Sequence, residues 1–163
     1  MLERVSVAIE TVCLGLWAGA MAAFAFIVAP IAFRTMPGMD LFAALTGAVI
    51  KGVGTFGSVC GGLAIVAGAL RASAAPARKL GLLRVGLVAI ALGASAYQTN
   101  AILPSMNAIS AQIHGPIDSV PRADPRRAAY DGEHKASTRV YGTAFICVIG
   151  ALALSAFGRR AVG

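Results

Sequence analysis

The sequence predicts an all-α integral membrane protein, folded as a four-transmembrane-helix up-and-down bundle in a single domain of residues 1–163. Composition is the first observation behind this prediction: apolar residues make up 58%, charged residues only 13%, and the mean hydropathy is +0.77. Such values exclude an ordinary water-soluble globule. The second observation is four stretches that each approach the roughly 20 apolar residues needed to cross about 30 Å of hydrocarbon. The lipid bilayer is therefore the first expected partner.

The first predicted span is residues 8–33. No formal charge lies between Glu10 and Arg34. The stretch is too long for a cleaved export signal, and it lacks the basic leader that such a signal has. We interpret it as a retained helix, with Glu10 marking a membrane boundary.

The second predicted span is residues 52–70. The apolar stretch 41–70 is longer than the bilayer requires, at about 45 Å for a rise of 1.5 Å per residue. The extra length lies outside the hydrocarbon layer if the ammonium group of Lys51 lies at the level of the headgroups. Residues 41–50 would then continue as an interfacial or protruding segment.

The third and fourth predicted spans are residues 82–104 and 137–158. A polar loop over residues 105–136, interrupted by three prolines, would connect them outside the membrane. Residues 105–113 are compatible with an extension of the third helix beyond the membrane surface.

Basic residues are divided equally between the two sides of this topology. The short connection at residues 71–84 is basic and free of acids, whereas the long loop dilutes its basic residues with acidic ones. The positive-inside rule then favours cytoplasmic termini, and we expect a bacterial cytoplasmic membrane.

The net charge of +7 arises from basic residues at the ends of spans, where lipid headgroups explain them. No nucleic acid partner is therefore expected.

Polar side chains gather at the end of the bundle opposite the termini, and they form the candidate polar or ligand site. This set comprises Asp131, His134, Ser137, Tyr141, Arg34, Lys51, Gln98 and Asn100. Within it, Asp131, His134 and Ser137 are three residues apart and therefore share one side of a helical turn.

Several roles remain open for these side chains. Lys51 and Arg34 either extend to lipid headgroups or pair with Asp131 or Glu133 at the same end. The amides of Gln98 and Asn100 are costly in hydrocarbon, so they either hydrogen-bond between helices or line a small wet cavity.

His134 is a candidate ligand of a metal or haem, or else a hydrogen-bonded cap for the last helix. A catalytic zinc site normally has three protein ligands, and the only other histidine is His114 in the loop. The sequence favours the cap.

Glycines form the most regular pattern, with an interval of seven residues along the second span and a G-x-x-x-G pair in the first. They are Gly47, Gly54, Gly61 and Gly68, with Gly15 and Gly19 in the first span. Small residues let helices approach closely in lipid, where no hydrophobic force drives them together. The pattern favours packing inside the bundle over a homo-oligomer or docking onto a larger membrane complex.

Two segments resemble a known family. Residues 16–34 read L-W-A-G-A-M-A-A-F-A-F-I-V-A-P-I-A-F-R, and residues 130–137 read Y-D-G-E-H-K-A-S. Together they resemble the transmembrane protein 205-like family, also catalogued as domain of unknown function 4149. The resemblance implies about four helices and no known reaction. It places Trp17, Pro30, Phe33, Asp131, His134 and Ser137 on motif positions, whereas Glu133 and Tyr141 depart from the family pattern.

Two classes of function follow. No complete catalytic motif is present, so the sequence favours a non-enzymatic accessory, scaffolding or assembly bundle in a membrane complex. The alternative is a membrane protein that binds a cofactor, metal or small solute around His134, with haem, a metal ion or a quinone as candidate cofactors and redox chemistry or transport as its role.

Overall fold

The structure is a computed structural model that describes residues 2–72, 78–113 and 116–157. The described residues contain no β-strand, and four helices are long and apolar enough to cross a membrane. We treat these as four helical rods. The first rod comprises α1 (Leu2–Ala23), η1 (Phe24–Val28) and α2 (Ala29–Thr35), and the second is α3 (Met39–Ala72). The third rod comprises α4 (Arg78–Tyr97), η2 (Gln98–Ile102) and α5 (Leu103–Ala111). The fourth rod is α6 (Pro125–Phe157), which follows the 3₁₀ turn η3 (Ile117–Ser119).

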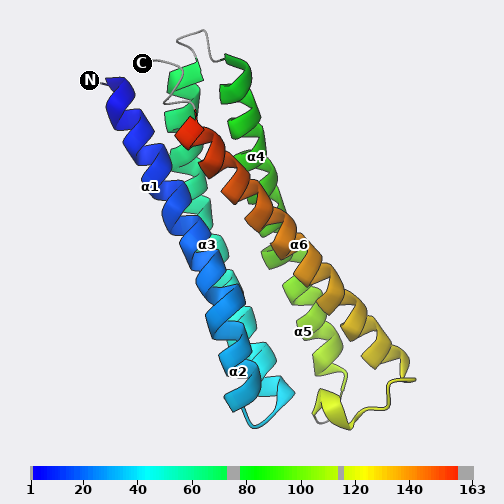
Figure 1. The fold of residues 1–163 in the computed structure, drawn as a ribbon. Helices are drawn as coiled ribbons and strands as arrows, with labels where there is room; N and C mark the ends of the chain where they lie inside the picture. The colour runs from blue at the N-terminus through cyan, green and yellow to red at the C-terminus, as the bar shows by residue number, and fades with distance from the viewer. Residues whose placement is uncertain (1, 73–77, 114–115, 158–163) are drawn as a thin grey trace.

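The rods run up and down, which confirms the predicted all-α membrane bundle. Figure 1 shows the start of α1 and the end of α6 at one end, here called the terminal end. At the other end, here called the loop end, α2 turns into α3 and α5 connects to α6. The most extensive contacts join α1 to α3 and α4 to α6, and these two pairs diverge toward the loop end.

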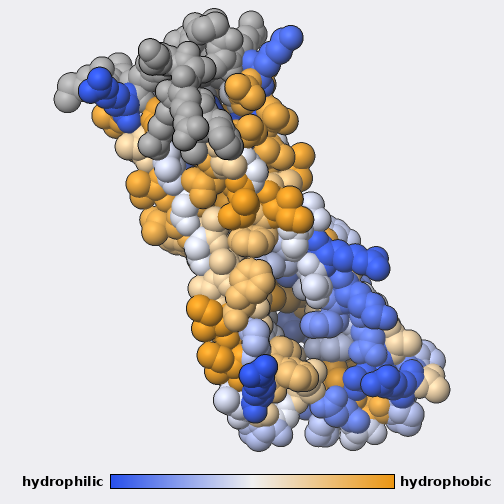
Figure 2. All heavy atoms as spheres, viewed as in Figure 1, coloured by the Kyte–Doolittle hydropathy of each residue, from blue (hydrophilic) through white to orange (hydrophobic). Residues whose placement is uncertain are grey.

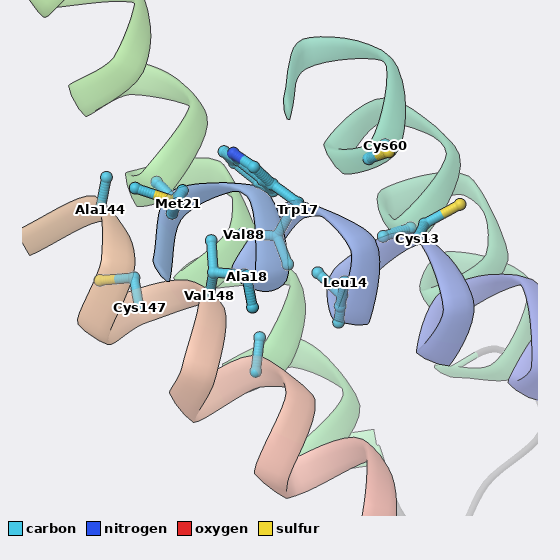
Figure 3. Close-up of a cluster of buried hydrophobic side chains, with 13 residues drawn as sticks. Cys13, Leu14, Trp17, Ala18, Met21, Cys60, Val88, Ala144, Cys147 and Val148 are labelled. Atoms are coloured by element: carbon cyan, nitrogen blue, oxygen red, sulfur yellow. The ribbon is translucent and has the colours of Figure 1, made fainter. Parts of the chain in front are cut away.

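The core lies midway along the bundle and is centred on Trp17. Leu14, Trp17 and Met21 of α1 are almost completely buried, together with Val88 of α4 and Val148 of α6. Figure 3 shows the indole ring of Trp17 directed away from α6 toward the other side of the bundle. Because lipid competes for apolar contacts, close packing around this ring is what holds the rods together.

Glycines on α3 make room for the ring. A Cβ atom added at Gly57 would lie 2.2 Å from Trp17 Nε1, and one added at Gly61 would lie 2.7 Å from Leu92 Cδ2 and 3.0 Å from Trp17 Cζ3. A side chain at either position would overlap the neighbouring helices. Glycine is therefore required here for close approach rather than for backbone freedom.

The other glycines of the predicted pattern divide into two groups. Gly54 and Gly68 also lie against neighbouring helices, because an added Cβ would be 3.0 Å and 3.4 Å from the nearest atom. At Gly15, Gly19 and Gly47 an added Cβ would meet no atom within 4 Å. Packing among the described residues does not require glycine at these three positions.

The connection between the third and fourth rods is shorter than the predicted loop of residues 105–136. The third rod continues to Ala111, and α6 already begins at Pro125. Asp124 explains the early start, because its Oδ1 accepts a hydrogen bond from the backbone N–H of Arg126 at 2.8 Å. Proline in the first helical turn and an aspartate just before it are both typical of helix starts.

The first and third rods each pass through a short π-helical turn before a proline. The nitrogen of Pro30 carries no hydrogen, so it cannot bond to the carbonyl of Phe26, and the same holds for Pro104 and Asn100. The helices widen in η1 and η2 and then continue as α2 and α5. Wide turns of this kind occur often at functional sites.

Candidate ligand-binding cleft

A cleft of about 680 Å³ opens at the loop end, where the two helix pairs diverge. Its walls come from η1, α2 and α3 on one side and from η2, α5 and α6 on the other. In Figure 2 the molecule is hollowed in this region, and hydrophilic side chains follow the N-terminal half of α6 beside the hollow. The volume lies in the range of about 300–1,000 Å³ that is usual for small-molecule sites.

Most of the predicted polar residues meet in this cleft. Its walls include Lys51, Gln98, Asp131, His134, Ser137 and Tyr141. The remaining two predicted residues, Arg34 and Asn100, are exposed and lie outside it. The Asn100 side chain donates a hydrogen bond from Nδ2 to the carbonyl of Ala96 at 2.9 Å, on its own helix.

Arg127 and Asp131 form the outer part of the α6 wall. Arg127 Nε donates to Asp131 Oδ1 at 3.1 Å, and Arg127 Nη1 donates to the carbonyl of Ile117 at 2.6 Å. The arginine thereby ties η3 to α6 and compensates the charge of Asp131. Arg127 was not among the predicted site residues, although its spacing of four residues from an aspartate on a helix is a recognisable signal.

Lys51 contributes a positive charge to the cleft, and His134 contributes an imidazole ring that can form hydrogen bonds. Across the described ranges, neither side chain has a hydrogen bond or an ion pair. Lys51 therefore does not pair with Asp131 or Glu133, the pairing that the sequence left open. Glu133 instead accepts a hydrogen bond from Ser105 Oγ at 2.9 Å. The lysine ammonium is the uncompensated charge of the cleft.

Hydrogen bonds between the helices fix the inner part of the cleft. Gln98 Nε2 donates to Ser137 Oγ at 2.9 Å, which joins η2 to α6. The hydroxyl of Tyr141 donates to the carbonyl of Met21 at 3.0 Å, which joins α6 to α1. These contacts pin α6 to both helix pairs immediately before they separate.

Apolar side chains complete the walls, chiefly on the side opposite α6. They include Phe24, Ala25, Ala29, Phe42, Ala43, Ile50, Leu103 and Met106. A site with one polar wall and one apolar wall is complementary to an amphipathic molecule.

A second polar cluster lies toward the terminal end and corrects the interpretation of Glu10 as a boundary marker. Glu10 is 2% exposed and its Oε1 lies 2.9 Å from Nε of Arg84, which is 5% exposed. Nearby, the hydroxyl groups of Thr11 and Ser155 are 3.2 Å apart. Both charged residues lie about two turns into parallel helices, and this similar depth is the signal for the pair that the sequence contains. Buried charges of this kind are stable only when paired.

The described part of the chain does not supply a metal site. No group of three histidine, cysteine, aspartate or glutamate side chains lies close enough to hold a metal ion within it. His114 lies outside the described residues. His134 thus has a place in the wall of a cleft but no set of fellow ligands among the residues described.

The fold and the cleft together define an integral membrane helical bundle, because the rods are membrane-length and their outward faces carry large apolar side chains such as Leu16, Val59 and Ile146. A family model described as "Domain of unknown function (DUF4149)" matches residues 12–115, and the chain belongs to this family. No curated protein and no solved structure matches the chain. The matched segment includes Lys51 and Gln98 and ends before the polar wall of α6.

Proposed function

We propose that this protein binds an amphipathic small molecule with an anionic head group in the cleft at the loop end. The observation that carries the proposal is Lys51, a cation without a protein partner among the described residues, which lies on α3 among the apolar side chains that face the polar wall of α6. An anion beside the ammonium would gain a charge-assisted hydrogen bond. The proposed role is non-enzymatic binding or carriage of a lipid-like acid.

The length of the rods supports an interfacial position for the cleft. Helix α3 has 34 residues and α6 has 33, so each is about 50 Å long, whereas the hydrocarbon layer is about 30 Å thick. The polar N-terminal half of α6 then extends to the headgroup region or beyond it. Amphipathic molecules in a bilayer place their head groups at this level, where Lys51 and His134 are available.

The test compares a long-chain fatty acid, oleate, with the uncharged oleyl alcohol, using purified protein in nanodiscs of zwitterionic lipid and isothermal titration calorimetry. Wild-type protein should bind the acid more tightly than the alcohol. Lys51→Met should remove this preference and weaken oleate binding by about 10- to 100-fold, because a charge-assisted hydrogen bond contributes about 1.5–3 kcal/mol.

Arg34→Met is the matched control, since Arg34 is a basic residue at the same end that lies outside the cleft. It should leave oleate binding unchanged. The proposal fails if wild-type protein does not bind oleate, or if the two variants behave alike.

A second candidate function is the accessory or scaffolding bundle. The observation that favours it is the uncovered G-x-x-x-G pair, because Gly15 and Gly19 leave open space on α1 that a helix of a second copy or of a larger complex would fill. Native mass spectrometry from mild detergent tests this candidate. A dimer or complex that dissociates in Gly15→Ile would support it, and a monomer in the wild type would contradict it.

We also propose that the membrane is a bacterial cytoplasmic membrane and that both termini are cytoplasmic. The basic connection at residues 71–84 supports this orientation. Thiol labelling of a single cysteine introduced at Ser119, which is exposed at the loop end, would test it in intact cells. Labelling by a membrane-impermeant reagent is expected. We further propose a relation to the transmembrane protein 205-like group, which the A-P-x-x-F element of residues 29–33 and the Y-D-x-x-H-x-x-S element of residues 130–137 support.

A further inference from the structure

Two buried polar atoms between the first and third rods have no partner among the residues described. They are Nε1 of Trp17 and Oε1 of Gln98, on side chains that are 0% and 2% exposed. An unpaired buried donor or acceptor costs about 1–3 kcal/mol, and folded proteins almost always supply a partner. Two such atoms on side chains that line the same cavity therefore point to a group that bonds to both.

The space they share is a small cavity. It has a volume of about 10 Å³ and is lined by Trp17, Gln98, Gly54, Thr99 and Tyr141, among others. This volume is about that of a single water molecule, and the cavity offers the polar partners that a buried water needs. The cavity is too small for a larger ligand.

The two atoms are held in fixed orientations. The indole ring of Trp17 is confined by Gly57 and Gly61, where an added Cβ would overlap it or touch it. The amide of Gln98 donates from Nε2 to Ser137 Oγ at 2.9 Å, which leaves Oε1 on the other side of the amide. One atom is a donor and the other an acceptor, so the complementary group must accept one hydrogen bond and donate another.

The small cavity is also the inner end of the cleft. Gln98, Thr99, Ile50 and Tyr141 line both spaces. A group in the small cavity would therefore meet the innermost part of any molecule in the cleft.

We propose that Trp17 and Gln98 form a site for one neutral hydroxyl oxygen, supplied either by a bound water molecule or by a hydroxyl group of a ligand in the cleft. A carboxylate has no proton for Gln98 Oε1, and an ammonium group has no lone pair for the indole N–H. The site links α1 to η2 through a bridging oxygen. Its evidence is independent of Lys51 and of the proposed anionic head group.

Trp17 is the only tryptophan, so the indole N–H gives one NMR signal that reports this site alone. The experiment uses protein labelled with ¹⁵N-indole tryptophan in deuterated detergent and measures magnetisation transfer from water to the indole proton. A cross-peak to a long-lived water is expected in the wild type. Adding dodecanol distinguishes the two sources: replacement of that peak by a contact to the alcohol assigns a ligand hydroxyl, and an unchanged peak assigns water.

Two variants separate the site from general packing. Gln98→Met removes the acceptor and should abolish the cross-peak. Ser137→Ala removes only the hydrogen bond on the other side of the amide and should retain it. An indole proton without any water or hydroxyl contact in the wild type would overturn the proposal, and so would a cross-peak that survives Gln98→Met. The wild-type spectrum alone is decisive if Gln98→Met does not fold.

Discussion

Gly57→Ala is expected to destabilise the bundle because the added methyl group would enter the space held by the indole ring of Trp17. The new Cβ would lie 2.2 Å from Nε1 and 2.4 Å from Cε2 of that ring. Non-bonded carbon atoms prefer about 3.5–4.0 Å, so the ring or the helix must move by more than about 1 Å. Gly61 and Leu92 confine the ring and the helix on the neighbouring turn, which leaves little room for this movement.

The magnitude follows from a comparison with Gly62→Ala on the same helix. An added Cβ at Gly62 meets no atom within 4 Å. Both substitutions gain the same helix propensity, up to about 1 kcal/mol, so this gain cancels between them. What remains is the overpacking cost of about 1–3 kcal/mol, which is the expected difference in the free energy of unfolding.

The assay is unfolding of each purified variant by sodium dodecyl sulfate in mild detergent, followed by far-ultraviolet circular dichroism. Fluorescence of the single tryptophan, recorded in parallel, should shift in Gly57→Ala and not in Gly62→Ala, since only the former displaces the ring. Equal unfolding midpoints for the two variants, with unchanged fluorescence in both, would refute the packing of Trp17 against Gly57.

Three further predictions follow from other parts of the molecule. Oleate binding should weaken by about 10- to 100-fold in Lys51→Met, measured by calorimetry, and an unchanged affinity would exclude Lys51 from the site. Glu10→Gln should lower the free energy of unfolding by about 3–5 kcal/mol in the detergent assay, because it leaves the buried charge of Arg84 without its carboxylate. The double variant Glu10→Gln with Arg84→Met should lose less stability than Glu10→Gln alone. An equal or larger loss in the double variant would contradict this reasoning. Hydrogen bonds from the side chain and backbone of Arg126 lower the pKa of Asp124 from 3.8 to about 2. The ionised carboxylate therefore stabilises the start of α6 above pH 3.8. Protection of the amides there, measured relative to the intrinsic exchange rate at each pH, should fall as the pH falls from 3.8 toward 2, whereas Asp124→Asn should remove this change in protection.

The sequence predicted the position of residues along the membrane normal better than their position around each helix. Span lengths and an up-and-down topology were enough to bring Lys51, Gln98 and His134 to one end. The direction in which a side chain points around the helix was harder to predict, because a face that packs and a face that contacts lipid are equally apolar. For this reason Gly54 and Gly15 could not be distinguished from sequence, although one lies against Thr99 and the other faces open space.

Two local features escaped prediction for a different reason. The similar distance of Glu10 and Arg84 from the starts of their helices was the one signal for this pair, because the relative depth of two separate helices is not fixed by sequence distance. The early start of α6 depends on Asp124 and Pro125, whose capping signal stands inside a proline-containing polar segment that otherwise reads as a loop.

The cleft itself follows from the backbone of the first and third rods. The π-helical turns η1 and η2 lie where the two helix pairs begin to diverge, and each contributes residues to the cleft wall, Phe24 and Ala25 from one and Gln98 and Thr99 from the other. Each turn precedes a proline that cannot donate to its helix, so the widening is encoded locally in both rods. Meanwhile the hydrogen bonds of Tyr141 and Gln98 hold α6 to both pairs just before this level. The bundle is therefore closed around Trp17 and opened beyond it by separate parts of the sequence.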